Sequence, residues 1–376
     1  MTGNSDNLKE RLCCIFNYAP HYRESIFKMM DEEMDCDFYF GDYIRTNIKK
    51  MEIRDLRQSK ELKTIWFSNK CYVISGSVML MFKPYKKYLL TGHIYCFSNW
   101  IILLLAIMFR KEVYVWNHGW YGKESLLRTW INKIYYSSVK AFFLYGEYAK
   151  KLMIRNGYSE KKLHVVYNSL DYEQTRASRN ELTKSDVFIS RFKNFAPVLI
   201  YIGRLQQVKK LDMLITAVYR MKLKGRPVNL VLIGDGEENS ALNDLTKRYS
   251  LTDNVWFYGP CYDEKVIGIL LYNADLCISP GNAGLTAIHS LSYGTPVITH
   301  NDFTRQMPEF ESITPGTTGS FYNAGSLDSL IREIETWLLD NPSKSIEVIQ
   351  ACFKTIDEKY NPAYQIRIFK DVLATK

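Results

Sequence analysis

The sequence predicts an α/β protein of two domains, each built on a doubly wound parallel sheet. Short apolar runs alternate with helical segments along most of the chain, which is the pattern of parallel strands joined by crossover helices. At 376 residues the chain is too long for one ordinary hydrophobic core. Two domains of about 170 to 200 residues are therefore expected.

The first half contains short apolar runs that we interpret as strands. Helices are expected between them, including one over 77–90 and a buried one over 99–110. The expected strands are 12–16, 37–40, 64–67, 94–97, 113–116, 141–144 and 163–166.

A polar, poorly patterned stretch over 171–196 is the best candidate for the domain boundary. We therefore predict an N-terminal domain over 1–180 and a C-terminal domain over 181–360. The tail, 361–376, has apolar residues at helical spacing. It is expected to form a helix that returns to the N-terminal domain.

Four expected strands of the second half end in loops that contain glycine. The strands cover 197–202, 228–233, 255–258 and 274–278, and the loops begin at Gly203-Arg204, Gly234-Asp235-Gly236, Gly259-Pro260 and Gly281. Because the carboxyl ends of parallel strands lie at one edge of a sheet, these loops predict one continuous ligand-binding crevice.

The stretch 278–300 should form the centre of this crevice. A loop with Gly281 and Gly284 opens a helix, which stops at Gly294 before a strand over 297–299. Small residues let backbone amides approach a ligand, and the start of a helix attracts anions. His289 shares a helix face with Leu285, one turn earlier. The stretch therefore predicts a phosphate or nucleotide-sugar site.

In the first half, His118 follows the strand 113–116 and precedes a glycine. This position lets a side chain reach into a crevice. A structural histidine that bonds the loop backbone is the alternative. His21 and Arg23 lie at the loop–helix junction after the first strand.

The charge is unevenly distributed. The net charge of the chain is +9. Residues 1–180 contain 28 basic and 18 acidic residues and have a net charge of +10, whereas residues 181–376 have a net charge of −1. A basic half favours an anionic partner, such as nucleic acid, a phosphate-bearing substrate or an acidic membrane surface. A merely solvated basic face is the alternative.

The eight cysteines form no CxxC pair and show no metal-ligand spacing with the six histidines. The N-terminus shows no secretory signal, and the longest apolar run, 100–109, is about half of a membrane span. We therefore expect a cytoplasmic protein.

Several segments of the second half match a known family in order and spacing. They are IGRLQQVKKLD, LVLIGDGEE, VWFYGP, ADLCISPG, GLTAIHSLSYGTPVI, and MPEFESI with TTGSF. The chain resembles the retaining glycosyltransferases of family 4, which have the GT-B fold of two facing Rossmann-like domains. The first half resembles the family more loosely, through VWNHGW and VVYNSLD.

The resemblance implies the following roles. Arg204 and Lys209 would hold the donor diphosphate, and His118 would lie near the donor sugar; these three are the catalytic candidates. Other donor-binding candidates are Gly203, Gly234, Asp235, Gly236, Tyr258, Pro260, Asn282, Ala283, Gly284, Leu285 and His289, and acceptor-side candidates are His21, Tyr22, Arg23 and Trp120. The family needs no metal ion for the diphosphate, so no cofactor is expected beyond the nucleotide-sugar co-substrate.

The chain departs from the family at two places. Most members carry two glutamates eight residues apart, and Gly281 and His289 stand at those positions here. Glycine offers no side-chain acceptor, whereas His289 can still bond to ribose or can merely pack in its helix. APHYR also replaces the usual double glycine of the first loop.

The leading hypothesis is a glycosyltransferase (EC 2.4) that moves a sugar from a UDP-sugar, favoured over a GDP-sugar, with retention. Its acceptor would be a saccharide or lipid-linked saccharide in bacterial surface polysaccharide assembly, reached at an anionic membrane surface on the inner face of the plasma membrane. The alternatives are a catalytically degenerate nucleotide-binding protein or partner subunit, and a sugar-nucleotide 2-epimerase. Nucleic acid is not expected as a partner, because no recognised module accompanies the bases.

Overall fold

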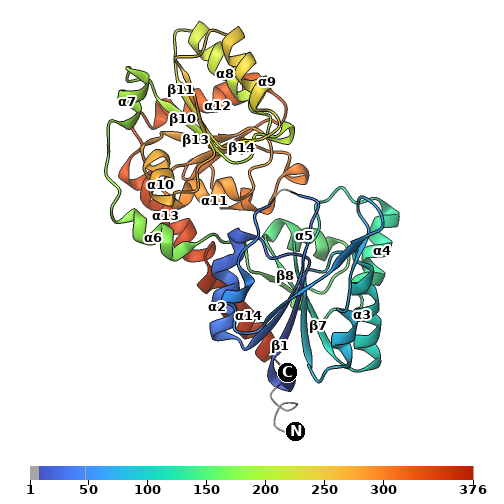
Figure 1. Ribbon diagram of the computed structural model, residues 1–376. Coiled ribbons are helices and arrows are strands. Elements are labelled where there is room, and N and C mark those ends of the chain that lie inside the picture. The colour runs from blue at the N-terminus through green and yellow to red at the C-terminus, as the bar shows by residue number, and fades with distance from the viewer. Residues whose placement is uncertain (1–7, 47, 376) are drawn as a thin grey trace. The chain divides into compact units, whose positions relative to one another are not determined.

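The computed structural model describes residues 8–46 and 48–375. The chain forms two compact units, Met1–Asp171 together with Pro362–Lys376, and Tyr172–Asn361. Each unit has helices on both faces of a mostly parallel sheet (Figure 1). The boundary between the units lies at the start of the polar stretch 171–196 of the sequence.

The sheet of the N-terminal unit has the strand order β3-β2-β1-β6-β7-β8-β9, and all its pairings are parallel. Its strands are β1 (Leu12–Phe16), β2 (Cys36–Gly41), β3 (Ser59–Leu62), β6 (Lys87–Leu90), β7 (Glu112–Asn117), β8 (Ala141–Leu144) and β9 (Leu163–Val165). The chain starts in the middle, builds outward to β3 and then crosses to the other side of β1. The boundary between β1 and β6 is therefore a topological switch point, where ligands bind in such sheets.

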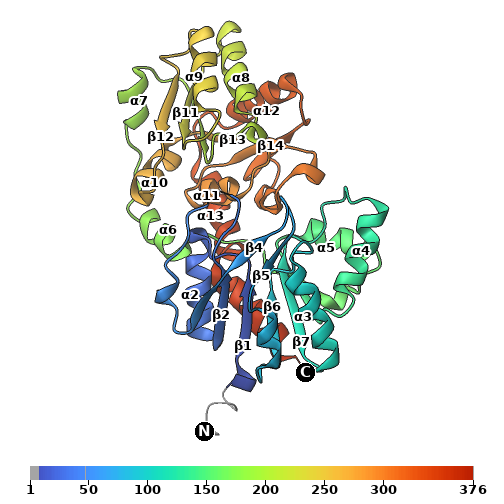
Figure 2. The same ribbon diagram turned by 45° about the vertical axis from the view of Figure 1, so that its right-hand side comes forward.

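Helices α2 (Glu24–Glu33) and α14 (Pro362–Ala374) cover one face of this sheet, and α3 (Phe97–Met108) and α4 (Leu126–Tyr136) cover the other (Figures 1 and 2). Helix α5 (Glu147–Arg155) connects β8 to β9. The ring of Phe369 packs 4.5 Å from that of Phe143, and Lys370 pairs with Glu33 of α2 at 2.6 Å. The expected return of the C-terminal helix is confirmed.

Two sequence-based element predictions in this unit were wrong. Residues 77–90 are not one helix, because a short 3-10 helix, η3 (Val78–Phe82), ends before Pro84 and the chain then enters β6. Residues 94–97 form no strand of the sheet, since Phe97 already begins α3. The strand expected over 64–67 is present as β4 (Thr64–Trp66), but it pairs antiparallel with β5 (Tyr72–Ile74) outside the parallel sheet.

The helix expected to be buried, 99–110, is α3, and only one of its sides is covered. Ile102, Leu103 and Ala106 pack in the core, whereas Ile101 and Leu104 point to solvent. Both sides of the helix are apolar, so its composition could not distinguish the covered side from the open one.

The sheet of the C-terminal unit has the order β12-β11-β10-β13-β14-β15, again with parallel pairing throughout. This is the strand order of dinucleotide-binding Rossmann domains, and its switch point lies between β10 and β13. The strands are β10 (Val198–Ile202), β11 (Asn229–Ile233), β12 (Val255–Gly259), β13 (Leu276–Ser279), β14 (Val297–His300) and β15 (Gly319–Tyr322).

The helices of this unit again form two layers (Figure 1). Helices α8 (Leu211–Leu223), α9 (Asn239–Arg248) and α12 (Leu327–Asp340) lie on one face, and α10 (Glu264–Asn273), α11 (Leu285–Ser292) and α13 (Ile346–Lys359) lie on the other. Two short helices, α6 (Tyr172–Arg179) and α7 (Val187–Phe192), precede the first strand.

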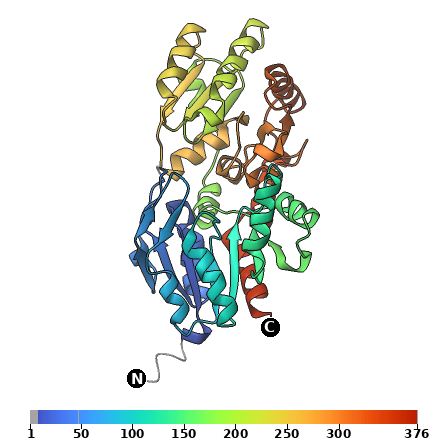
Figure 3. The ribbon, with the colours of Figure 1, turned by 90° about the vertical axis from the view of Figure 1, so that its right-hand side faces the viewer.

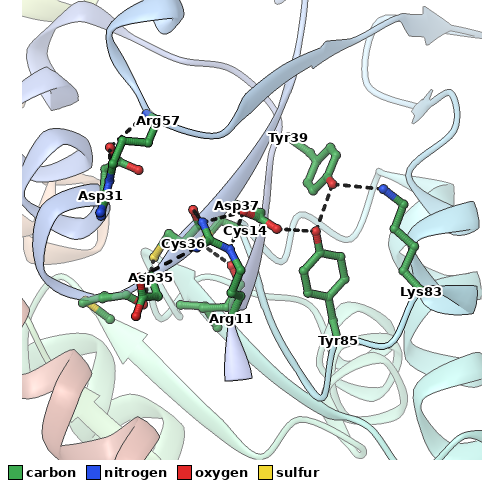
Figure 4. Close-up of polar contacts among 12 residues, drawn as sticks. Arg11, Cys14, Asp31, Asp35, Cys36, Asp37, Tyr39, Arg57, Lys83 and Tyr85 are labelled. Carbon is green, nitrogen blue, oxygen red and sulfur yellow. Dashed lines mark hydrogen bonds and ion pairs between the residues drawn. The ribbon is translucent and has the colours of Figure 1, made fainter. Parts of the chain in front are cut away.

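A buried polar network joins the amino ends of the central strands in the N-terminal unit (Figure 4). The guanidinium of Arg11 pairs with the Asp37 carboxylate at 2.7 Å, and the hydroxyl of Tyr85 donates to the other oxygen of that carboxylate. The hydroxyls of Tyr39 and Tyr85 lie 3.1 Å apart. The network thus connects the start of β1 with β2 and the segment before β6, at the sheet edge opposite the switch-point loops.

We expect Tyr85→Phe to destabilise the N-terminal unit by about 1–3 kcal/mol, because it leaves buried oxygens of Asp37 and Tyr39 short of a partner. Urea unfolding followed by tryptophan fluorescence measures this. Tyr43→Phe is the matched control, since Tyr43 is 55% exposed. Equal unfolding midpoints for the two variants would show that the network contributes nothing.

Candidate functional site

The loops after β10 and β13 meet at the switch point of the C-terminal unit. Lys209 ends the short helix η5 (Gln207–Lys209), and its Nζ donates to the backbone oxygen of Asn282 at 2.8 Å and to Oδ1 of Asn282 at 2.7 Å. The amide of Gly281 donates back to the carbonyl of Lys209 at 2.9 Å. The two loops are thereby fixed to each other at the switch point.

The environment of Lys209 weakens its hold on its proton. Burial and the nearby Arg204 guanidinium lower the pKa of Lys209 to about 8, while Glu309 opposes the shift. Arg204 itself is exposed, and among the described residues its side chain makes no hydrogen bond or ion pair. Two cationic side chains therefore stand together at the switch point.

Gly281 has no room for a side chain. A Cβ atom there would lie 2.0 Å from the carbonyl oxygen of Val208 and 2.7 Å from Cα of Lys209. The backbone of η5 thus occupies the space that a side chain would need. At this position a glutamate would have to displace the loop that carries Lys209.

Gly284 begins α11 with a φ of 52°, a conformation that favours glycine. The first amides of a helix have no partner within the helix, and their dipole attracts an anion. The amide of Ala283 is already used, because it donates to Oε1 of Gln306 at 2.9 Å. Thr286 donates to the carbonyl of Ile202 at 2.8 Å and so joins α11 to the end of β10. The amides of Gly284 and Leu285, at the start of α11, are therefore candidate donors to an anion.

The two glycines of the Gly234–Gly236 turn are required for close packing. A Cβ at Gly234 would lie 1.9 Å from the carbonyl oxygen of Gly203, and one at Gly236 would lie 2.3 Å from that of Leu205. The carboxylate of Asp235 accepts from the amide of Gly236 at 2.8 Å, within the turn. These contacts give the Gly234–Gly236 turn a packing role. Tyr258, within β12, is partly buried, and Pro260, just after the strand, is exposed.

His289 has a partner that sequence reasoning missed. Its Nε2 lies 3.0 Å from Oε2 of Glu264, and the hydroxyl of Tyr293 donates to the same oxygen at 2.8 Å. Burial raises the pKa of Glu264, but the hydrogen bonds from His289 and Tyr293 bring it below its usual value. Glu264 begins α10, immediately after the loop that leaves β12, so its carboxylate lies at the same edge of the sheet as the crevice.

In the N-terminal unit, His118 follows β7, near the switch point between β1 and β6. Its Nδ1 is buried and has no hydrogen-bond partner among the described residues. Burial, together with the charges of Arg23 and His93, lowers the pKa of His118 to about 4, so the ring is neutral at pH 7. Its centroid lies 4.8 Å from that of Tyr145.

The acceptor-side candidates fall in different environments. Arg23 lies over the ring of Trp116 at 4.7 Å and donates to the hydroxyl of Tyr145, so it belongs to the His118 cluster. His21 is exposed, with Nδ1 3.1 Å from the carbonyl oxygen of Lys49, and Tyr22 stacks edge-on against it. Trp120 is 3% exposed and packs in the core of the N-terminal unit.

No group of three or more histidine, cysteine or acidic side chains within residues 8–46 and 48–375 is arranged to hold a metal ion.

Known structures share this architecture. The chain is similar to Alr3699/HepE of Anabaena, crystallised in complex with UDP, with a TM-score of 0.73 and 13% identity over 97% of this chain and 99% of that one. It is also similar to the apo lipopolysaccharide outer core galactosyltransferase WaaB, with a TM-score of 0.69 and 15% identity over 97% and 99% of the two chains. The two units thus define the class of protein, which is the GT-B fold.

Sequence comparison gives a match in the second half of the chain. Residues 183–351 match the profile of the family described as glycosyl transferases group 1. The matched residues lie within the C-terminal unit, make up less than half of the chain, and include the motifs that carry the resemblance to a glycosyltransferase family.

The curated relatives match over shorter stretches. Glycogen synthase 2 of Nitrosococcus oceani is 34% identical over 104 residues, which are 26% of this chain and 20% of that protein. The 2-deoxystreptamine glucosyltransferase of Streptomyces kanamyceticus is 19% identical over 218 residues, or 58% and 51% of the two chains. The matches therefore span about a fifth to a half of the length of these relatives.

The depressed pKa of His118 predicts a pH-dependent stability. Between about pH 6.5 and pH 4 the unfolded chain binds a proton at this ring that the folded chain does not, so acidification through this range should destabilise the N-terminal unit. His118→Gln should reduce that loss, measured as the shift of the urea midpoint between pH 7 and pH 4.5. An unchanged pH dependence in the variant would contradict the assignment.

Proposed function

We propose that the protein transfers a sugar from a nucleotide-diphosphate sugar, with UDP favoured over GDP, and with retention of anomeric configuration. The observation that carries the proposal is the pair of cations at the switch point, Lys209 held by Asn282 and the exposed Arg204 beside it. The match of residues 183–351 to the group 1 profile and the likeness to a protein crystallised with UDP and with UDP-glucose support it.

The chemistry explains why cations are needed there. When the sugar–phosphate bond breaks, negative charge builds up on the departing diphosphate, and cations already in place stabilise that charge. Arg204 can bind two phosphate oxygens at once, while Lys209 supplies a point charge. The amides of Gly284 and Leu285, at the positive end of α11, are suited to the same phosphates. No metal ion is needed for this role.

We assign the sugar-side contact to His118. A neutral ring with a buried, unpartnered Nδ1 can exchange a hydrogen bond with a sugar hydroxyl without competition from the protein. Arg23, packed against the rings beside it, is assigned to the acceptor side.

Glu264 and His289 are assigned to the ribose. If Nε2–H of His289 donates to Glu264, Nδ1 of the neutral ring becomes an acceptor, as a carboxylate oxygen would be. The pair would then take over the function of the family's second glutamate. Gly281, which has no space for a side chain, leaves the first glutamate without a replacement at its own position.

For the acceptor we propose a saccharide or lipid-linked saccharide of bacterial surface polysaccharide assembly, reached at the inner face of the plasma membrane. Two observations support this: the N-terminal half carries the chain's excess positive charge, and the similar galactosyltransferase WaaB is named for the lipopolysaccharide outer core.

A binding-only protein is the second candidate, because Gly281 and His289 replace both family glutamates. Incubation with UDP- and GDP-sugars, followed by measurement of released nucleotide, separates the two. Saturable binding without turnover or hydrolysis of any donor would favour the binding-only function.

Lys209→Met should weaken UDP binding about 10- to 100-fold, the range for losing a hydrogen bond to a charged group. The wild-type affinity should fall as the pH rises from 7 to 9.5, because Lys209 loses its proton near pH 8 and the protonated form binds the diphosphate better. The variant should lose that pH dependence. Isothermal titration with UDP measures both effects, and normal affinity in Lys209→Met would reject the site.

His289→Ala and Glu264→Ala should each weaken UDP binding by about 1–2 kcal/mol, and the double variant should be no weaker than either, because the two side chains act as one unit. Tyr293→Phe is the matched control, since it removes the other hydrogen bond to Glu264 but leaves His289 in place. Additive losses, or none, would assign the pair to packing.

A further inference from the structure

The N-terminal unit has an apolar surface on the outer sides of α3 and α4. Both helices cover the same face of the sheet, and in Figure 3 they lie in front of it. Because each packs one side on the sheet, their opposite sides point away from it in the same direction. On α3 and α4 these outward sides consist of large apolar residues.

The exposed apolar residues of each helix lie on one face of that helix. Their spacing follows the helical repeat on α3 and also on α4. They are Phe97, Ile101, Leu104, Ile107 and Met108 on α3, and Leu126, Leu127, Trp130 and Ile134 on α4. Leu126 is 91% exposed and Trp130 62%. Such residues at i, i+4 and i+7 or i+8 form a continuous apolar stripe.

The stripes are parts of one surface. The ring of Trp100 on α3 lies 4.8 Å from that of Tyr135 on α4, so the helices are in contact. At the other end, Phe109 lies 5.5 Å from Phe82 of η3, which is itself exposed, as is Met79. We call the outward residues of η3, α3 and α4 the α3–α4 surface. Single exposed apolar residues are common on protein surfaces, whereas the α3–α4 surface gathers many of them into one area.

The charge around this surface is mostly positive. Residues 79–140 contain nine lysines and arginines and two glutamates. Both glutamates are engaged: Glu112 pairs with Lys140 at 2.9 Å, and Glu124 accepts from the amides of Tyr121 and Gly122 at 2.8 Å each. Exposed bases flank the stripes, namely Lys83, Arg110, Lys123 and Lys133.

We propose that the α3–α4 surface docks the protein on an anionic lipid bilayer, with both helices lying in the plane of the interface. Apolar helix sides bordered by bases are the pattern of interfacial helices, whose apolar residues enter the headgroup–acyl boundary while the bases contact anionic headgroups. The surface binds a membrane without crossing it, since no helix in the described part of the chain is long and apolar enough to span one.

The charge around the surface favours a bilayer over two other occupants, which are a second copy of the chain and a protein partner. A second copy of the chain would bring the same basic border against itself, because a two-fold interface pairs each patch with its own copy. A protein partner would need a matching acidic border around an apolar centre. A bilayer containing anionic lipid supplies both an apolar interior and negative headgroups. It can do so over an area as large as the whole α3–α4 surface.

The proposal deepens the proposed function, since the acceptor assigned there is lipid-linked. Its test needs no sugar donor. Membrane binding can therefore be absent in a protein that has transferase activity, and transferase activity can be absent in a protein that binds membranes.

The experiment measures co-sedimentation of the full chain with vesicles of phosphatidylcholine, alone or with about one-third phosphatidylglycerol. We expect binding to the anionic vesicles, weakened by salt, and at least a tenfold lower partition coefficient for Leu104→Gln/Leu127→Gln/Trp130→Gln. The matched control is Leu223→Gln/Leu339→Gln, which removes exposed leucines of the C-terminal unit and should bind as the wild type does. UDP affinity should be unchanged in both variants, which confirms that they are folded.

Lys123→Gln/Lys133→Gln provides a second measurement that leaves the apolar residues of the α3–α4 surface in place. It should lower the partition coefficient and reduce its salt dependence. Equal binding of the wild type and the triple variant would overturn the proposal. Self-association of the wild type in sedimentation velocity, lost in the triple variant and without vesicle binding, would overturn it in favour of a second copy.

Discussion

The double hydrogen bond from Lys209 to Asn282 is the interaction on which the candidate donor site depends. It joins the loop after β10 to the loop after β13, and these two loops lie on either side of the switch point of the sheet. The close approach at Gly281 reinforces it from behind, because the backbone of Val208 and Lys209 fills the space of a side chain. The close approach of these two loops therefore positions the Lys209 cation and also leaves no space for a carboxylate side chain at residue 281.

Much of the C-terminal unit follows from its sequence, because its signals are local. Three of the four apolar runs are followed directly by a glycine, and at Gly203 and Gly234 this glycine allows the loops to pack closely. The strand order then brings the loops together, and the position of Lys209 in the crevice was predictable from the order of motifs alone.

The N-terminal unit was harder to predict because its aromatic runs fit a helix and a strand equally well. The segment before β6 has helical spacing, but Pro84 interrupts it and the pairing of Lys87 to Leu90 with strands on both sides decides its structure. The partner of His289 was beyond sequence reasoning for a related reason. Glu264 lies 25 residues away on another helix, and only the packing of α10 against α11 brings the two side chains together.

The exposed side of α3 shows the limit of composition most clearly. An apolar run of this length looks the same whether the neighbouring layer covers it on one side or on both, so the run predicted a buried helix. Among the described residues, the outer sides of α3 and α4 stay exposed, and so do the bases Lys83, Arg110, Lys123 and Lys133. The two units thus present their basic residues in different environments. In the C-terminal unit, burial lowers the pKa of Lys209 to about 8, and the proposed donor diphosphate would favour its charged form. In the N-terminal unit, the bases border the exposed apolar surface for which we propose an anionic bilayer.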